Sequence, residues 1–347
     1  MRTSYGVPLS VAIQTDVGRV RSNNEDSNGH AWLKDGSLFM MVADGMGGHE
    51  AGEVASSLAV QVVEDVVSRD ASGDPRERLY NALLEANDNI LDEGRRGGKG
   101  GMGTTAVCCI VRGREVHVAL VGDSRLYQFR RGHLVWRTVD HTRVQMLIDH
   151  GEITEEEARV HPEAGMLTRA LGHQRMADGR PLVPDVIGEP LAIEDGDGMV
   201  LCSDGLHDLI EDWEIGRLVA GKDGDEAAQA LVELACERGG HDNVTVAVCI
   251  VGDRFTEYDP NYVPPAREKA EATFAGQDTE ESQPRSPVAP AAPPPTGVFK
   301  AADVDETPAP AGGSRMGLII GVVLLLLLLG GGGILLVAVL AGAYLSM

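Results

Sequence analysis

The chain has 347 residues, of which 43% are hydrophobic, which is enough for one or two domains with a substantial core. Its formal net charge of −23 at pH 7 argues against nucleic acid as a partner, because phosphate backbones are bound by basic patches. The five cysteines show no Cys-x-x-Cys spacing, so we expect reduced, buried thiols rather than a disulfide framework.

Residues 1–252 alternate strand-like and helix-like patterns, which predicts one α+β domain. The expected strands are 9–15, 37–43, 105–111, 115–121, 124–130, 198–203 and 244–251, and the expected helices are 51–68, 75–93, 142–150, 154–160, 212–220 and 225–238. Neighbouring short strands joined by Arg112-Gly113-Arg114 indicate a hairpin, and therefore antiparallel sheets. The spacing of Thr154 and Glu157 predicts a capping box, and Gly221 and Gly239 predict helix ends.

Acidic residues recur at the ends of apolar runs. Asp44-Gly45 closes the run 38–43, Asp204-Gly205 closes 199–203, and Asp242 precedes the run 244–251. A single Asp-Gly is typical of a turn. Three carboxylates at strand ends, beside glycines that let backbone come close, instead favour an oxygen-ligand site for a hard divalent cation.

Further motifs lie around these acids. Residues 21–26 read RSNNED, residues 103–105 read GTT, and residues 121–125 read VGDSR. The ordered series RxxNED, ADGMGGH, GTT, VGDSR, SDG and DNVTV strongly resembles the bacterial branch of the metal-dependent serine/threonine protein phosphatases of type 2C. The resemblance covers roughly the first 250 residues.

The resemblance implies a four-layer α-β-β-α sandwich of two antiparallel sheets flanked by helices. It also implies hydrolysis of phosphoserine and phosphothreonine in proteins by a metal-activated water, in opposition to a serine/threonine kinase. The implied cofactors are two Mg²⁺ or Mn²⁺ ions, with a third ion in bacterial relatives. An inactive phosphoprotein-binding scaffold and a regulatory phosphatase of a partner-switching stress-response system are the alternatives.

The resemblance also assigns roles to the acidic residues. Asp44 is the ligand that bridges two metals, and Gly45 contributes its backbone carbonyl. Asp204 and Asp242 complete the coordination of one metal. With Arg21, the three aspartates Asp44, Asp204 and Asp242 form the expected catalytic set.

The resemblance implies three more positions near the metals and a role for Arg21 at the substrate. Glu25 and Asp26 are expected to reach the metals through bound waters, and Asp123 to hold the third ion together with Asp204. Arg21 is the expected phosphate clamp, because a guanidinium matches phosphate oxygens bidentately. The GTT hydroxyls and Ser124-Arg125 are expected to be scaffold.

One position departs from the eukaryotic pattern. Many eukaryotic members carry a His directly after the first Asp-Gly, where this chain has Met46, as bacterial members do. The nearest histidine, His49, is a candidate general acid or a structural residue of a Gly-rich turn. Residues 141–180 correspond to a mobile flap in bacterial relatives, and we expect substrate selection there.

The composition changes after residue 252. Eleven of the 17 prolines fall in residues 253–315, mixed with Ala, Glu and Thr, which predicts a disordered, extended linker. Residues 316–345 contain no charge and include a leucine block at 324–329, which predicts a membrane-spanning helix because about 20 apolar residues cross a bilayer.

The flanking residues orient this predicted anchor. Arg315 precedes it, and residues 1–18 lack the basic start and apolar core of a signal peptide. We therefore expect a single-pass protein of the cell membrane with a cytoplasmic catalytic domain. Its expected partners are phosphorylated proteins, among them a membrane serine/threonine kinase.

Overall fold

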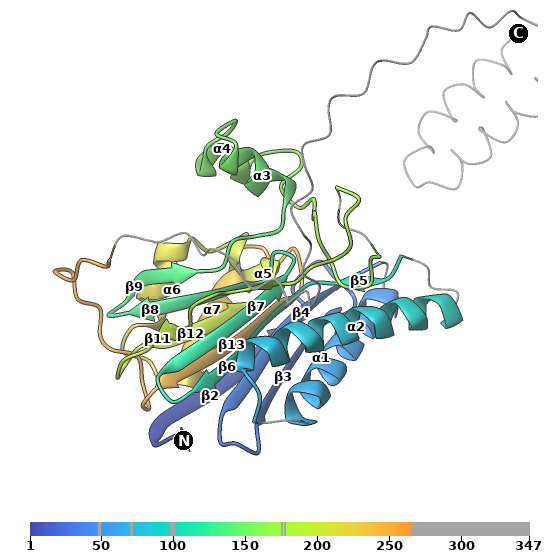
Figure 1. Cartoon of the computed structure of the whole chain (residues 1–347). Helices are drawn as coiled ribbons and strands as arrows, with labels where there is room; N and C mark the ends of the chain where they lie inside the picture. Colours follow the sequence, from blue (N-terminus) through green and yellow to red (C-terminus); the bar gives the residue numbers. More distant parts are fainter. Residues whose placement is uncertain (48–49, 70–71, 98–100, 175, 177, 266–347) are drawn as a thin grey trace, which may run out of the picture. The chain divides into compact units, whose positions relative to one another are not determined.

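The computed structural model describes residues 1–265 apart from 48–49, 70–71, 98–100, 175 and 177. Two antiparallel sheets form the centre of the fold (Figure 1). The first has the strand order β1 (Arg2–Ser4), β2 (Val7–Asp16), β13 (Val244–Val251), β12 (Gly198–Cys202), β8 (Arg125–Arg130) and β9 (His133–Arg137). The α+β class with antiparallel sheets is confirmed.

The second sheet has its own strand order and carries two short side pairings. Its order is β10 (Asp185–Val186), β7 (Glu115–Val121), β6 (Ala106–Arg112), β4 (Leu38–Met46) and β3 (Asp26–Trp32), with β11 (Leu191–Ala192) paired to β7 and β5 (Gly103–Thr104) paired to β4. The chain passes from the second sheet to the first between β7 and β8, through residues 122–124.

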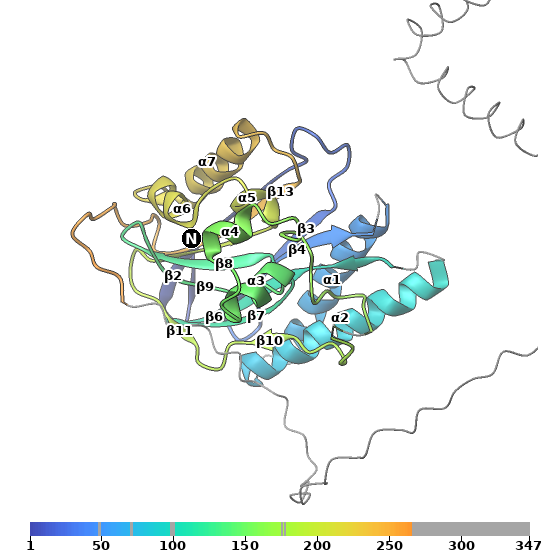
Figure 2. The same cartoon turned by 90° about the horizontal axis from the view of Figure 1, so that it is seen from above.

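Helices cover the outer faces of both sheets. α1 (Glu50–Arg69) and α2 (Pro75–Gly97) pack on the second sheet, whereas α5 (Asp204–His207), α6 (Asp212–Val219) and α7 (Gly224–Glu237) pack on the first (Figures 1 and 2). α3 (Arg143–Asp149) and α4 (Glu155–Arg159) stand apart from this sandwich in Figure 1.

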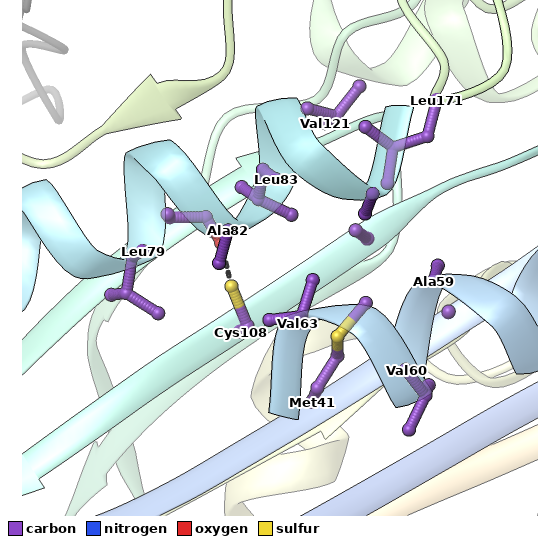
Figure 3. Close-up of a cluster of buried hydrophobic side chains, with 14 of the residues drawn as sticks. Met41, Ala59, Val60, Val63, Leu79, Ala82, Leu83, Cys108, Val121 and Leu171 are labelled. Carbon is purple, nitrogen blue, oxygen red and sulfur yellow. Dashed lines mark hydrogen bonds between the residues drawn. The ribbon is translucent and has the colours of Figure 1, made fainter. Parts of the chain in front are cut away.

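The layering explains why several strands are apolar throughout. β13 is buried at every position because Val244, Val246 and Val248 face the helices, while Ala247 and Cys249 face the other sheet. On the second sheet, β4, β6, α1 and α2 together form a dense core, shown in Figure 3 through Met41, Ala59, Val60, Val63, Leu79, Ala82, Leu83 and Cys108. Burial raises the pKa of the Cys108 thiol well above its usual range, so this cysteine is an inert packing residue.

The predicted helix signals are confirmed. The Thr154 hydroxyl accepts from the Glu157 N–H at 3.2 Å, and the Glu157 carboxylate accepts from the Thr154 N–H at 2.8 Å, which completes the capping box of α4. Gly221 and Gly239 follow the ends of α6 and α7 with φ of 71° and 126°, a backbone region that favours glycine.

The packed domain extends past residue 252, where the sequence places the start of the linker. Phe255 is only 3% exposed, and its N–H donates to the Lys222 carbonyl at 2.9 Å. Its ring lies against Gly198, where an added Cβ would come within 1.9 Å. Contacts with the domain therefore continue beyond the boundary predicted at 252, because one aromatic side chain in a polar stretch packs into the core of the first sheet.

The remainder of the predicted linker and the predicted anchor at 316–345 lie outside the described residues. Within the part of the chain that the structure does describe, no helix is both long enough and apolar enough to span a membrane.

Candidate metal centre

The predicted site residues lie where strands of both sheets end. Asp44 is near the end of β4, and Asp26 stands directly opposite it at the start of β3. In the other sheet, Asp204 begins α5 just after β12, and Asp242 lies two residues before β13. Four segments distant in sequence therefore bring carboxylates to one end of the sandwich.

A cavity of about 300 Å³ opens at this end. Its lining includes all but one of the predicted site residues: Arg21, Glu25, Asp44, Gly45, Asp123, Asp204 and Asp242. Asp26 is the exception: its carboxylate is buried beside this cavity without lining it, and it accepts from the Ser203 hydroxyl at 2.7 Å.

Burial and mutual repulsion disfavour ionisation of these acids. Desolvation, followed by the charge of Asp204, raises the pKa of Asp44 well above its usual range, and the same causes act on Asp204 through Asp123. Burial raises the pKa of Asp123 to about 7 and that of Asp26 to about 6. Such a cluster can be fully ionised only if a cation compensates the charge.

Two carboxylate oxygens at this site indicate that a cation would fit there. The Asp26 Oδ1 and Asp204 Oδ1 atoms are buried and have no hydrogen-bond partner among the described residues. A buried carboxylate oxygen without a donor is costly, and an oxygen-seeking ion would satisfy it. Within the same described ranges, no three His, Cys, Asp or Glu side chains already converge as a ready-made metal cage. The orphaned oxygens and the repulsion, rather than a preformed cage, favour an oxygen site for Mg²⁺ or Mn²⁺.

Gly45 lets three segments approach each other closely. Its N–H donates to the Glu25 carbonyl at 3.1 Å, and an added Cβ would lie 2.2 Å from the Gly52 carbonyl oxygen. Gly52, in the first turn of α1, in turn lies under the Glu25 carboxylate, where a Cβ would come within 2.1 Å of Oε2. Any larger residue at either glycine would push the Asp44 strand end away from Glu25.

Arg21 lies at the mouth of the cavity on the loop between β2 and β3. Its guanidinium is exposed, and Nη2 donates to the Asp242 Oδ2 at 2.7 Å. The predicted phosphate clamp thus already stands beside a predicted metal ligand, where an incoming phosphate would meet both.

The expected scaffold residues hold the acids in place. The Thr105 N–H donates to the Asp44 carbonyl at 2.8 Å, and the Thr105 hydroxyl accepts from the Asp44 N–H at 3.0 Å. The same hydroxyl lies 2.7 Å from the Ser124 hydroxyl, next to Asp123. Thr105 therefore links the strand end that carries Asp44 to the turn that carries Asp123.

Asn243 is a site residue that the sequence reasoning missed. Its side chain accepts from the Glu25 N–H at 2.8 Å and donates to the Val17 and Asn23 carbonyls at 3.0 and 2.9 Å. It is 4% exposed and fastens the loop that carries Arg21 to the start of β13. A polar residue directly after Asp242, at the start of an apolar strand, was the available signal.

Comparisons with known proteins agree with this geometry. Residues 15–244 match the family model described as Protein phosphatase 2C. A putative protein phosphatase 2C-type of Streptococcus pyogenes is 35% identical over 244 residues, covering 69% of this chain and 96% of that protein. The serine/threonine protein phosphatase PstP of Mycobacterium tuberculosis is 38% identical over 246 residues, covering 71% of this chain but only 45% of that protein.

A solved structure extends the likeness to three dimensions. The catalytic domain of PstP, crystallised in complex with two manganese ions, superposes with a TM-score of 0.61 at 36% identity, covering 71% of this chain and 99% of that one. The family model matches well over half of the chain. The matched part contains most of the strands of the two sheets and the carboxylate cluster described above. The chain belongs to the protein phosphatase 2C family.

Proposed function

We propose that the carboxylate cluster at the end of the sandwich holds two or three Mg²⁺ or Mn²⁺ ions for the hydrolysis of phosphoserine and phosphothreonine in proteins. The observation that carries this proposal is the pair of buried, unpartnered oxygens on Asp26 and Asp204, set among aspartates whose pKa values are raised. When bound, the ions supply Lewis acidity that activates water and neutralises phosphate charge.

The ligand roles that we propose are those that the family resemblance implies, and the positions of the side chains are compatible with them. Asp44 is near enough to Asp204, Asp26 and Asp123 for their charges to raise its pKa, and it is our proposed bridging ligand, with Gly45 contributing its carbonyl oxygen. Asp204 and Asp242 approach from the other sheet, and Asp123 stands beside Asp204 as the ligand of a third ion. Glu25 lines the same cavity and the Asp26 carboxylate is buried beside it, and in our proposal both would reach the ions through bound waters.

Arg21 is our proposed substrate clamp. Its exposed guanidinium lines the cavity and pairs with Asp242 through one nitrogen, and the planar group offers further N–H donors with which it would bind a phosphate. A cavity of about 300 Å³ with one cation and several acids accommodates a phosphoryl group only when metal charge offsets the acids.

The test is hydrolysis of p-nitrophenyl phosphate as a function of Mn²⁺ concentration, with calorimetry of Mn²⁺ binding. Asp44→Asn should lower kcat about a thousandfold and reduce the number of bound ions, because it removes ligand charge. Asp195→Asn is the matched control, since Asp195 is an exposed aspartate on the loop before β12. Wild-type kcat in Asp44→Asn would contradict the assignment. Phosphopeptide binding without Mn²⁺-dependent turnover would instead favour the scaffold alternative.

We propose further that residues 316–345 anchor the enzyme in the cell membrane, with the catalytic domain in the cytoplasm and a membrane serine/threonine kinase among its partners. The support is sequence alone: the segment has no charge, contains the leucine block 324–329 and follows Arg315. Membrane fractionation tests it, because an embedded helix resists salt and alkali and needs detergent. Full release of the protein by alkali would contradict the proposal that residues 316–345 are embedded in the membrane.

A further inference from the structure

The α3–α4 insertion, residues 143–166, leaves and rejoins the domain at one point. Thr142 and Leu167 form an isolated antiparallel bridge, and the Arg143 N–H donates to the Met166 carbonyl at 2.8 Å. Figures 1 and 2 show α3 and α4 lying over the same end of the sandwich as α5, which begins at Asp204. The insertion therefore adjoins the mouth of the metal centre.

Two further depressions continue from the metal centre along the base of the insertion. The first, of about 310 Å³, shares Met46, Gly165 and Leu167 with the wall of the metal centre. The second, of about 750 Å³, shares Leu167 and Arg169 with the first. Leu167 thus lines all three hollows, so a polypeptide whose phosphorylated residue enters the metal centre would meet the larger depression on the other side of Leu167.

The three arginines of the larger depression are each paired with a carboxylate that also lines it. Arg143 pairs with Glu163 at 3.6 Å, and Arg169 pairs with Asp185. Arg180 pairs with Asp178 at 2.6 Å. Because these cations are already matched by carboxylates, they offer a charged ligand little net attraction.

Beside these ion pairs, the depression also exposes apolar side chains. Met146 of α3 is 38% exposed and Met166 is 52% exposed, and both line it together with Leu167. Thioether side chains are unbranched and polarisable, so they adapt to apolar groups of different shape. We call Met146, Met166 and Leu167 the methionine groove.

We propose that the methionine groove binds an apolar side chain of the phosphoprotein substrate, a few residues from the phosphorylated serine or threonine. The inference rests on the proposed function and adds a preference for substrate sequence to it. Its basis is the continuity of the groove with the metal centre, together with exposed apolar surface between charges that are already paired.

The experiment compares phosphothreonine peptides that are identical except for one leucine, placed in turn at each flanking position of a Ser/Gly background. The wild-type enzyme should hydrolyse the peptide with leucine at one or two positions with about tenfold higher kcat/KM, mainly through a lower KM. The double variant Met146→Ser/Met166→Ser should lose this preference. Its activity on p-nitrophenyl phosphate should stay at the wild-type level, because neither methionine lines the metal centre.

Val160→Ser provides the matched control. Val160 is 86% exposed at the end of α4 and lies outside the groove, so its substitution removes apolar surface from the same insertion and should leave the leucine preference unchanged. Equal kcat/KM for every peptide, or an equal loss of the leucine preference in the Val160 and methionine variants, would overturn the proposal that the groove binds substrate.

The proposal would also be overturned if the wild type were a dimer and the methionine variants were monomers, because a second copy of the chain would then cover the groove. Absence of Mn²⁺-dependent hydrolysis of p-nitrophenyl phosphate by the wild type would overturn the proposed function as well, which separates the two failures.

Discussion

Asn243 shows how a single amide fixes the substrate side of the metal centre. The loop between β2 and β3 has little regular structure, yet it must hold Arg21 at the cavity. All three hydrogen bonds of the Asn243 side chain go to backbone atoms of this loop or its end, at Val17, Asn23 and Glu25. Asn243 therefore acts as a positioning residue for the guanidinium.

The isosteric substitution Asn243→Asp tests this role. It replaces two donated hydrogen bonds with a charge that faces the Val17 and Asn23 carbonyls, so the loop should detach while the packing volume stays constant. At saturating Mn²⁺ we expect KM for a phosphopeptide to rise about tenfold, with kcat within about threefold of wild type.

Asn89→Asp is the control for this prediction, because Asn89 is exposed on α2 and its amide donates to the Glu85 carbonyl one turn earlier in the same helix. A purely structural role for Asn243 would appear differently. The melting temperature would then fall with KM unchanged, and the idea that Asn243 positions Arg21 would be wrong.

At the scale of elements, the metal centre is built from strand ends of two sheets, and the carboxylates at these ends repel each other. β4 contributes Asp44, the turn from β7 to β8 contributes Asp123, and β12 leads into Asp204. Without metal, the sheets can come together here only if some of these acids are protonated, because burial and neighbouring charges raise their pKa values.

The metal-free domain should therefore lose stability as pH rises. Asp123 has a folded pKa of about 7 against about 3.9 in an unfolded chain, so the folded state binds more protons across this interval. The free energy of unfolding then falls with pH until the folded pKa is passed. We expect the melting temperature of EDTA-treated protein to fall from pH 6.5 to 7.5, and saturating Mn²⁺ to remove this fall.

The titration of a buried histidine determines which pH interval and which control variant the experiment needs. Burial lowers the pKa of His207 to about 4, so His207 adds stability as pH rises through its unfolded pKa of about 6.5, in the opposite direction. The decisive quantity is the difference between wild type and Asp123→Asn, which removes one raised carboxylate. Identical pH slopes for the two metal-free proteins would show that Asp123 is not protonated in the folded state.

The predictability of the elements follows their burial. β13 and α1 were predicted nearly to their ends because long apolar patterns specify them. β3, with the sequence Asp-Ser-Asn-Gly-His-Ala-Trp, was missed because it is a half-exposed edge strand without alternation. The single turn of α5 was missed too, because it forms only where Asp204-Gly205 meets the start of β13.

The candidate site divides in the same way. Carboxylates at strand ends were visible in the sequence, and all but Asp26 line one cavity. Their roles as ligands came from family resemblance and stay predictions. Asn243 and Ser203 were not predicted, because a buried amide or hydroxyl becomes meaningful only when its partners are known. Those partners lie roughly 180 to 220 residues away in the chain.

At the scale of the whole molecule, the end of the catalytic domain decides how much chain is available as a tether. Phe255 is buried, and the Thr256 N–H donates to the Gly196 carbonyl at 3.0 Å. Further on, Tyr258 stacks on His133 with ring centroids 4.9 Å apart. These contacts make residues 253–258 part of the domain, so the proposed tether starts later than the composition suggests.

Two truncations test this boundary. A chain ending at residue 265 should keep the melting temperature of the domain and full activity on p-nitrophenyl phosphate. A chain ending at residue 252 loses the buried Phe255 ring, which costs about 3 kcal/mol and should lower the melting temperature by about 10 °C. Phe255→Ala in the longer chain should reproduce most of this loss, whereas Val263→Ala, at an 84% exposed position, should not. Equal melting temperatures for the two truncations would mean that the segment after 252 only rests on the surface, and that the tether begins there after all.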